Sequence, residues 1–226
     1  MGDAGGVVGE AQGGAVVEAT VGAGARACRP AGVAGYGCGA PFFSPHTRDG
    51  SVLADLSPVI AATTEWLTRA YPASGGALAS ALCEAQARQA VTVAAWLRYP
   101  TVTDAALLGI AGPGGSQRLD RISGADADTG RDTDDSAWRS WVDEVVASWA
   151  ACLLADPGLA AGAVAGLAGG DHTRGTAPDF RRLVAPDRRD RQAAALLRHP
   201  DLLACVAGLH HTQLLGRLGR GPALIA

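Results

Sequence analysis

From about residue 51 onward, apolar residues recur at intervals of three and four, and prolines and glycines interrupt the pattern. Side chains at this spacing lie on one face of an α-helix, so the pattern is typical of amphipathic helices with one buried face. The sequence therefore predicts an all-α fold, an irregular bundle of about six to eight helices.

The first two predicted helices have clear ends. Ser57 and Pro58 supply a cap and an initial proline for a helix that Pro72 ends, and Pro100 closes a second helix over residues 76–98. Glu84 and Arg88, four residues apart, should form an exposed ion pair. The expected buried stripes are Val59, Ile60, Thr63, Trp66, Leu67 and Ala70 on the first helix, and Leu78, Leu82, Ala85, Val93 and Trp96 on the second.

Two further helices are expected in the middle of the chain. Residues 103–111 predict a short helix, which "GPGGSQ" ends. A longer helix should start at the cap Asp135–Ser136. Its stripe would be Trp138, Trp141, Val142, Val145, Trp149, Cys152 and Leu153. We interpret this as a core helix, and a tryptophan-lined groove for a ligand or a partner is the alternative.

Three similar stretches end in proline: "VAAWLRYP", "AACLLADP" and "AAALLRHP" end at Pro100, Pro157 and Pro200. Proline disfavours a helical conformation for the residue before it and is well tolerated in the first turn of a new helix. Each stretch therefore predicts a corner between two helices. The unequal spacing favours an irregular bundle over a helical repeat.

Glycines stand four residues apart at positions 158, 162, 166 and 170. A stripe of this kind lets a second helix approach closely. The preceding turns are also apolar, which leaves a membrane-associated helical hairpin as an alternative. Asp156 and Pro157 interrupt the apolar stretch and argue against a membrane association.

The first 50 residues are rich in glycine, which disfavours a helix. We expect a flexible arm over 1–50 and a single helical domain over 51–226. Gly22, Gly24 and Ala27 mimic a dinucleotide-binding turn, but Pro30 stops the helix that such a turn needs. No cofactor is therefore expected there.

Composition excludes several kinds of chemistry. The chain has no lysine and no asparagine, which points to a GC-rich genome and rules out Schiff-base and Walker A lysines. A net charge of −3 argues against general nucleic-acid binding. Five cysteines at irregular spacing indicate small buried hydrophobes rather than a disulfide framework. We expect a cytoplasmic protein, because no signal-peptide pattern is visible.

Candidate chemistry is sparse. The acidic segment 126–135 departs from a calcium loop at Arg131 and Ala137, and no histidine pair has metal-binding spacing, so we expect no metal. The histidines are His46, His172, His199, His210 and His211. His210 is interpreted as a core residue, and a phosphorylatable or catalytic role for His210 or His211 is the alternative. The arginine-rich segment 180–192 is expected to be a solvated loop, with a phosphate contact as the alternative.

No catalytic grouping can be recognised, and no catalytic residue is assigned. The leading hypothesis is a non-catalytic helical interaction or regulatory protein that binds a protein partner or self-associates. One alternative is an enzyme with an inter-helix pocket that uses Asp and His residues, with or without a divalent metal or an organic ligand. The other is a membrane-associated helical hairpin protein.

Overall fold

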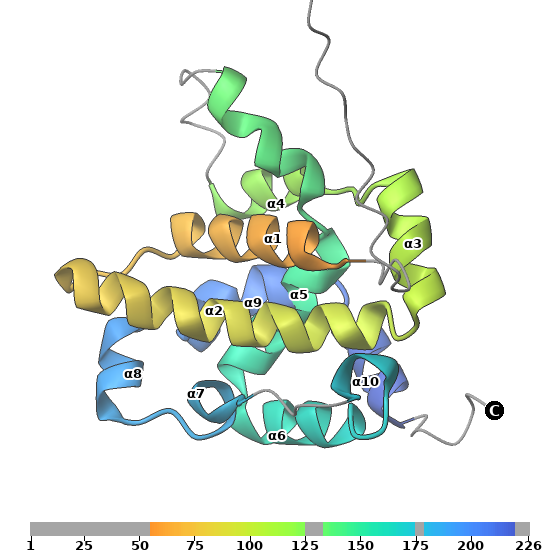
Figure 1. Ribbon diagram of the computed structural model, residues 1–226. Coiled ribbons are helices and arrows are strands. Elements are labelled where there is room, and N and C mark those ends of the chain that lie inside the picture. The colour runs from red at the N-terminus through yellow and green to blue at the C-terminus, as the bar shows by residue number, and fades with distance from the viewer. Residues whose placement is uncertain (1–54, 125–132, 175–178, 220–226) are drawn as a thin grey trace, which may run out of the picture. The chain divides into compact units, whose positions relative to one another are not determined.

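The computed structural model describes residues 55–124, 133–174 and 179–219, which form ten α-helices and two 3-10 helices and contain no strand (Figure 1). The predicted all-α fold is confirmed. The proposed arm over 1–50 and the acidic residues 126–132 lie outside the described residues. The division into an arm and a domain therefore stays a prediction.

The described part contains more helices than the six to eight predicted, because short helices occupy segments expected to be loops. The segment 180–192, expected to be one solvated loop, contains two of them. In chain order the elements are α1 (Ser57–Ala70), α2 (Gly76–Arg98), α3 (Val102–Ala111), α4 (Ser116–Ser123), η2 (Thr133–Trp141), α5 (Glu144–Ala155), α6 (Pro157–Gly166), η3 (Asp171–Thr173), α7 (Arg181–Val184), α8 (Arg188–Ala193), α9 (Pro200–Ala207) and α10 (His211–Gly219).

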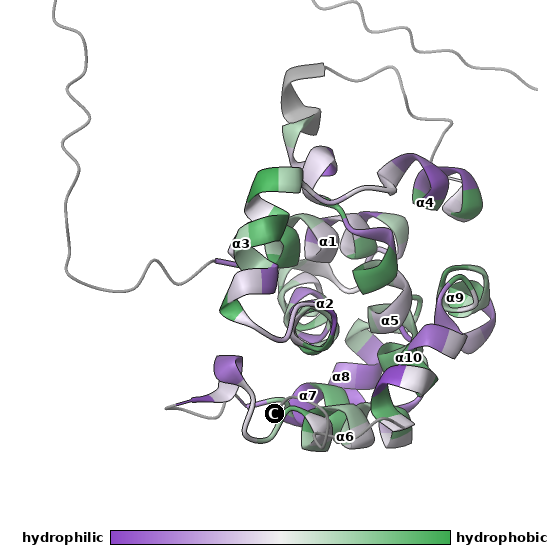
Figure 2. Cartoon of the chain, turned by 90° about the vertical axis from the view of Figure 1, so that its right-hand side faces the viewer, coloured by the Kyte–Doolittle hydropathy of each residue, from purple (hydrophilic) through white to green (hydrophobic). Residues whose placement is uncertain are grey.

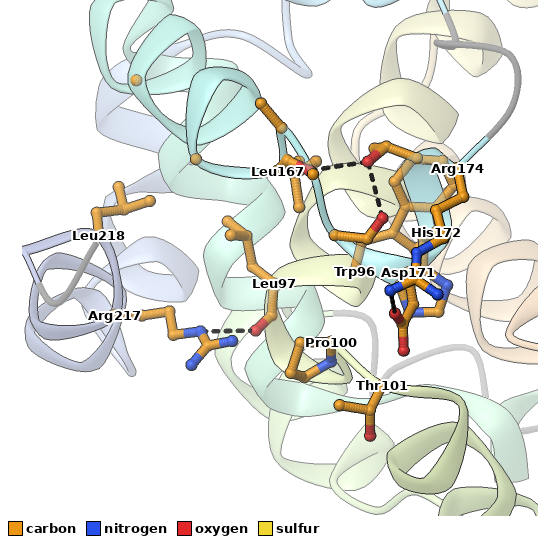
Figure 3. Close-up of a pocket in the computed structure, with 16 residues that line it drawn as sticks. Trp96, Leu97, Pro100, Thr101, Leu167, Asp171, His172, Arg174, Arg217 and Leu218 are labelled. Atoms are coloured by element: carbon orange, nitrogen blue, oxygen red, sulfur yellow. Dashed lines mark hydrogen bonds and ion pairs between the residues drawn. The ribbon is translucent and has the colours of Figure 1, made fainter. Parts of the chain in front are cut away.

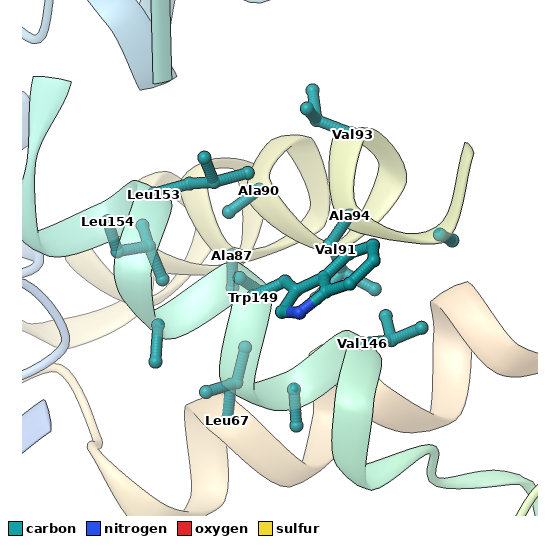
Figure 4. Packing of buried hydrophobic residues seen from close by; sticks show 14 of the residues in the cluster. Leu67, Ala87, Ala90, Val91, Val93, Ala94, Val146, Trp149, Leu153 and Leu154 are labelled. Atoms are coloured by element: carbon teal, nitrogen blue, oxygen red, sulfur yellow. The ribbon is translucent and has the colours of Figure 1, made fainter. Parts of the chain in front are cut away.

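Helix α5 is the centre of the bundle. Nine of its residues, Val146 to Leu154, are buried without interruption, since α1, α2, α6, α9 and α10 all pack against it. Trp149, Leu153 and Leu154 lie against the alanine-rich face of α2 (Figure 4). Small side chains on one helix and large ones on the other let the two backbones approach closely and fill the space between them.

The predicted bounds of α2 match the structure, but its predicted stripe is partly wrong. Leu78 is 70% exposed, whereas Cys83, Ala87, Ala90 and Ala94 face the core. Leucines were preferred in the prediction because they are more hydrophobic. In the structure α2 turns its small residues toward α5 and leaves Leu78 in the first, solvent-facing turn.

The predicted tryptophan helix is two elements. Trp138 and Trp141 lie half-buried on η2, and Trp149 is buried on α5. The helix breaks at Asp143, whose backbone is extended and whose carboxylate caps α5 by accepting a hydrogen bond from the Val146 N–H at 2.9 Å. The Tyr99 hydroxyl at the end of α2 donates to the same carboxylate at 2.5 Å.

The predicted corners at Pro100 and Pro157 are confirmed, but the one at Pro200 is confirmed only on its C-terminal side, because α8 ends at Ala193 and residues 194–198 form turns. Pro157 and Pro200 are the first residues of α6 and α9, and Pro100 lies between α2 and α3. Asp156 caps α6 by accepting hydrogen bonds from two backbone N–H groups, those of Gly158 and Leu159. At α1 the predicted cap is off by one position: Ser57 is already helical, and Leu56 precedes the helix.

No helix in residues 55–124, 133–174 or 179–219 combines the length and the apolar character that a bilayer span requires.

Candidate functional site

A cavity of about 470 Å³ opens between the C-terminal end of α2, the segment from α6 to η3, and α10 (Figure 3). We call it the α2–α6–α10 pocket. Its volume lies within the range of small-molecule sites in proteins, about 300–1,000 Å³. The lining residues are Trp96, Leu97, Pro100, Thr101, Gly162, Gly166, Leu167, Ala168, Gly169, Gly170, Asp171, His172, Thr173, Arg174, Arg217 and Leu218.

The glycine stripe of α6 forms one wall of this pocket. A Cβ atom added at Gly162 would meet nothing within 4 Å, and one added at Gly166 would meet only the Leu218 Cδ2 atom, at 3.9 Å. The prediction that a second helix packs closely along this stripe is therefore wrong for Gly162, whereas α10 approaches Gly166 through Leu218. The missing side chains leave the cavity open.

Aromatic rings form a second wall. The rings of Trp96 and His172 are stacked, with their centroids 5.5 Å apart and their planes 14° apart, and Phe180 meets Trp96 edge to face at 5.9 Å. The His172 Nε2 atom lies 2.6 Å from the Tyr99 carbonyl oxygen. Because a carbonyl only accepts, Nε2 carries the proton, and Nδ1 is an acceptor when the ring is neutral. This bond holds η3 against the end of α2.

Three charged side chains line the pocket. Arg174 and Asp171 form an ion pair at 3.1 Å on the rim, where Arg174 is 78% exposed. Arg217 is half-buried, and its Nε donates to the Leu97 carbonyl oxygen at 3.1 Å. No contact joins its terminal Nη1 and Nη2 groups to another of the described residues. The charge of Asp171 is thus matched, whereas no acidic side chain among residues 55–124, 133–174 and 179–219 pairs with Arg217.

His210 lies outside this pocket, in the turn between α9 and α10. Its Nε2 is 2.7 Å from the Glu144 Oε1 atom, to which Arg118 also donates at 3.1 Å. Ser148 accepts a hydrogen bond from the His210 backbone N–H and donates to the Ala207 carbonyl, so its hydroxyl does not contact the imidazole. His210 is thus half-buried and paired with a carboxylate, and its buried Nδ1 has no hydrogen-bond partner among the described residues. The interpretation of His210 as a core residue agrees with its position only in part.

The other sequence candidates are scattered. His199 and His211 are exposed, and His46 lies outside the described residues. Within the described ranges, no cluster of three or more His, Cys, Asp or Glu side chains is arranged to hold a metal ion.

The prediction of buried cysteines holds for Cys83 and Cys152 and is wrong for Cys205, which is exposed on α9. Burial raises the pKa of the Cys152 thiol to about 11 and also raises that of Cys83. Cys28 and Cys38 lie outside the described residues.

The arginine-rich segment has a structural role in its buried part. Asp190 is buried, caps α8 together with Asp187, and forms an ion pair with Arg182. Arg181, Arg188 and Arg189 are exposed.

No family model, curated protein or solved structure matches this chain. The site therefore has to be interpreted from its own geometry.

Sequence reasoning missed the pocket residues. Trp96 was assigned to a core stripe, and neither His172 nor Arg217 was given a role there. The glycine stripe was the signal that could have pointed to the pocket, because an open groove along a helix also needs small residues.

Proposed function

We propose that the protein is a non-catalytic helical binding protein that holds a small organic ligand in the α2–α6–α10 pocket. The observation that carries this proposal is the cavity itself: two glycines of α6 leave it open, and the stacked Trp96 and His172 rings give it an ordered wall. Ligand sites combine apolar walls with polar groups that orient the ligand, and this pocket contains both kinds of lining residue.

The polar contacts of the pocket support binding rather than catalysis. The Thr101 hydroxyl belongs to the capping box of α3, and the Thr173 hydroxyl donates to the backbone carbonyl of Leu167 at 3.0 Å. His172 is fixed through Nε2 by a carbonyl, and Asp171 is paired with Arg174. Catalysis by a nucleophile needs that group beside a base, and in the described part of the pocket each hydroxyl is engaged in local structure.

Filling the cavity tests the proposal. Gly162→Leu should place an isobutyl group in the pocket without backbone strain, because its φ is not positive and its surroundings are open. Gly109→Leu is the matched control, since Gly109 is also helical with open surroundings but does not line the pocket.

The measurement is ligand-observed NMR on the full chain with four probes: benzoate, phenyl phosphate, benzamide and benzyl alcohol. We expect at least one probe to bind the wild-type protein and the Gly109→Leu variant, and to lose binding in Gly162→Leu. Absence of binding by all four probes, or binding unchanged by Gly162→Leu, would contradict the proposal.

A second candidate function rests on α3. Leu107 and Ile110 are 59% and 84% exposed, and only Ala105 and Leu108 of this helix are buried. Figure 2 shows α3 as an apolar helix at the edge of the bundle. A contiguous apolar surface of this kind is typical of an interaction site.

We infer that a second copy of the chain covers this face, because its exposed side chains are apolar and can pack against an identical face. The double variant Leu107→Ser/Ile110→Ser should abolish concentration-dependent dimerisation in light scattering. Leu78→Ser, which removes an exposed leucine from α2, should leave dimerisation intact. A wild-type protein that stays monomeric at all concentrations would exclude self-association through α3.

A further inference from the structure

We propose that the ligand of the α2–α6–α10 pocket is an organic anion whose carboxylate or phosphate is bound by the two terminal amino groups of Arg217. This inference rests on the proposed function and adds the chemical class of the ligand. The charges of the described side chains that line the pocket do not balance.

Arg217 is held in a fixed orientation. Its Nε donates to the Leu97 carbonyl oxygen in the last turn of α2 at 3.1 Å, and its stem comes from α10 beside Leu218 (Figure 3). One edge of the guanidinium is therefore engaged by the protein. The Nη1 and Nη2 groups at the other end can donate in parallel, which matches the two oxygens of a carboxylate or a phosphate.

Within the described part of the chain, no lining residue neutralises this arginine. The charged lining residues there are Asp171, Arg174 and Arg217, and Asp171 is engaged by Arg174 at 3.1 Å. The charges of these three side chains sum to one positive charge. A half-buried guanidinium with unmatched donors favours an anion, because a charge-assisted hydrogen bond is stronger than a neutral one.

The other lining residues indicate which chemical groups the rest of the ligand can contain. Leu97 and Leu218 lie beside Arg217, Trp96 also lines the pocket, and Gly162 and Gly166 contribute no side chains to it. A compact apolar or aromatic group can be buried there while its anionic end reaches Arg217.

The test compares charged and neutral probes of the same size on the full chain. We expect benzoate and phenyl phosphate to bind at least about tenfold more tightly than benzamide and benzyl alcohol in NMR titrations. Arg217→Met should remove this preference. Arg217→Lys, which keeps the charge but loses the paired donors, should retain part of it.

The double variant Asp171→Asn/Arg174→Gln is the matched control within the pocket. It removes both partners of the rim ion pair and leaves the charge of Arg217 unchanged, so it should keep most of the preference for the anions. The indole signals of the five tryptophans report whether each variant retains the wild-type fold.

The outcomes separate the two proposals. Benzamide binding as tightly as benzoate, with both lost in Gly162→Leu, would overturn the anion proposal and leave the pocket function standing. A preference that survives in Arg217→Met would also overturn it. No binding by any of the four probes would overturn the pocket function itself. A stronger response to benzoate or to phenyl phosphate would identify which anion the site prefers.

Discussion

Arg198 shows how a single buried side chain holds several segments together. It follows α8, and its guanidinium donates to the Gln86 Oε1 atom at 2.5 Å and to the Leu154 and Arg182 carbonyls at 3.2 and 2.7 Å. Gln86 on α2 in turn donates to the Asp190 carbonyl at 2.9 Å. Burial lowers the pKa of Arg198, and the neighbouring Asp190 opposes this shift. The arginine thus connects α2, α5, α7 and α8.

Arg198→Met should lower the free energy of unfolding by about 2–4 kcal/mol, because it leaves the Gln86 amide and several backbone carbonyls without a donor. Urea unfolding measures this change. Arg88→Met is the control: Arg88 forms an exposed pair with Glu84, so its loss should change stability by less than about 0.5 kcal/mol. Equal effects of the two variants would show that the Arg198 contacts do not stabilise the fold.

At the scale of the element, α6 has a well-capped first turn, whereas glycines lower the stability of its interior. The Asp156 carboxylate caps its first turn, and Pro157 is well suited to its first position. Glycines 158, 162 and 166 then lower its helical stability, since glycine loses more backbone freedom on folding than any other residue. The missing side chains of Gly162 and Gly166 also leave the pocket open, so the same residues that weaken the helix make room for the cavity.

Gly162→Ala should stabilise the protein by up to about 1 kcal/mol, because its Cβ meets open space and alanine favours the helix. Gly115→Ala should destabilise it by about 1–3 kcal/mol. Gly115 has a φ of +117°, and a Cβ there would lie 2.5 Å from the Glu144 Cβ. Thermal unfolding measures the stability of both variants. A stabilising effect of Gly115→Ala would contradict the described turn before α4.

At the scale of the whole described bundle, buried cysteine thiols and tyrosine hydroxyls make the free energy of unfolding depend on pH. Cys152 on α5 packs against the Ala207 carbonyl, and burial raises its pKa from an ordinary 9.0 to about 11. Burial also raises the pKa of Tyr71, of Cys83 and of Tyr99, which donates to Asp143. In each case the folded state favours the neutral form.

Because these folded-state pKa values lie above the unfolded ones, the stability that the groups contribute is complete below about pH 9. For Cys152 it is lost as the pH rises from 9 toward 11. The free energy of unfolding should therefore fall over this range. Cys152→Ser keeps a donor for the Ala207 carbonyl, but serine does not titrate between pH 9 and 11. The free energy of unfolding of this variant should therefore fall less steeply with pH. Urea unfolding from pH 7 to 11 measures both, and identical slopes would exclude Cys152 as a contributor.

The sequence by itself determined the fold class, the bounds of α2 and the starts of α6 and α9. These features depend on residues close together in the chain: Gly75 just before α2, Pro100 after it, and Pro157 and Pro200 at the first positions of α6 and α9. Local sterics and capping fix such positions wherever the helices pack.

Only the tertiary structure decided which faces are buried and what the remaining residues do. The break before α5 is supported by Tyr99, 44 positions before Asp143, and the pocket joins Trp96 to His172 and Leu97 to Arg217 across 76 and 120 positions. Periodicity shows that a helix has an apolar side but not which neighbour covers it. Whether the glycines of α6 would meet another helix or an open cavity was therefore decided by the packing of α2 and α10 around them.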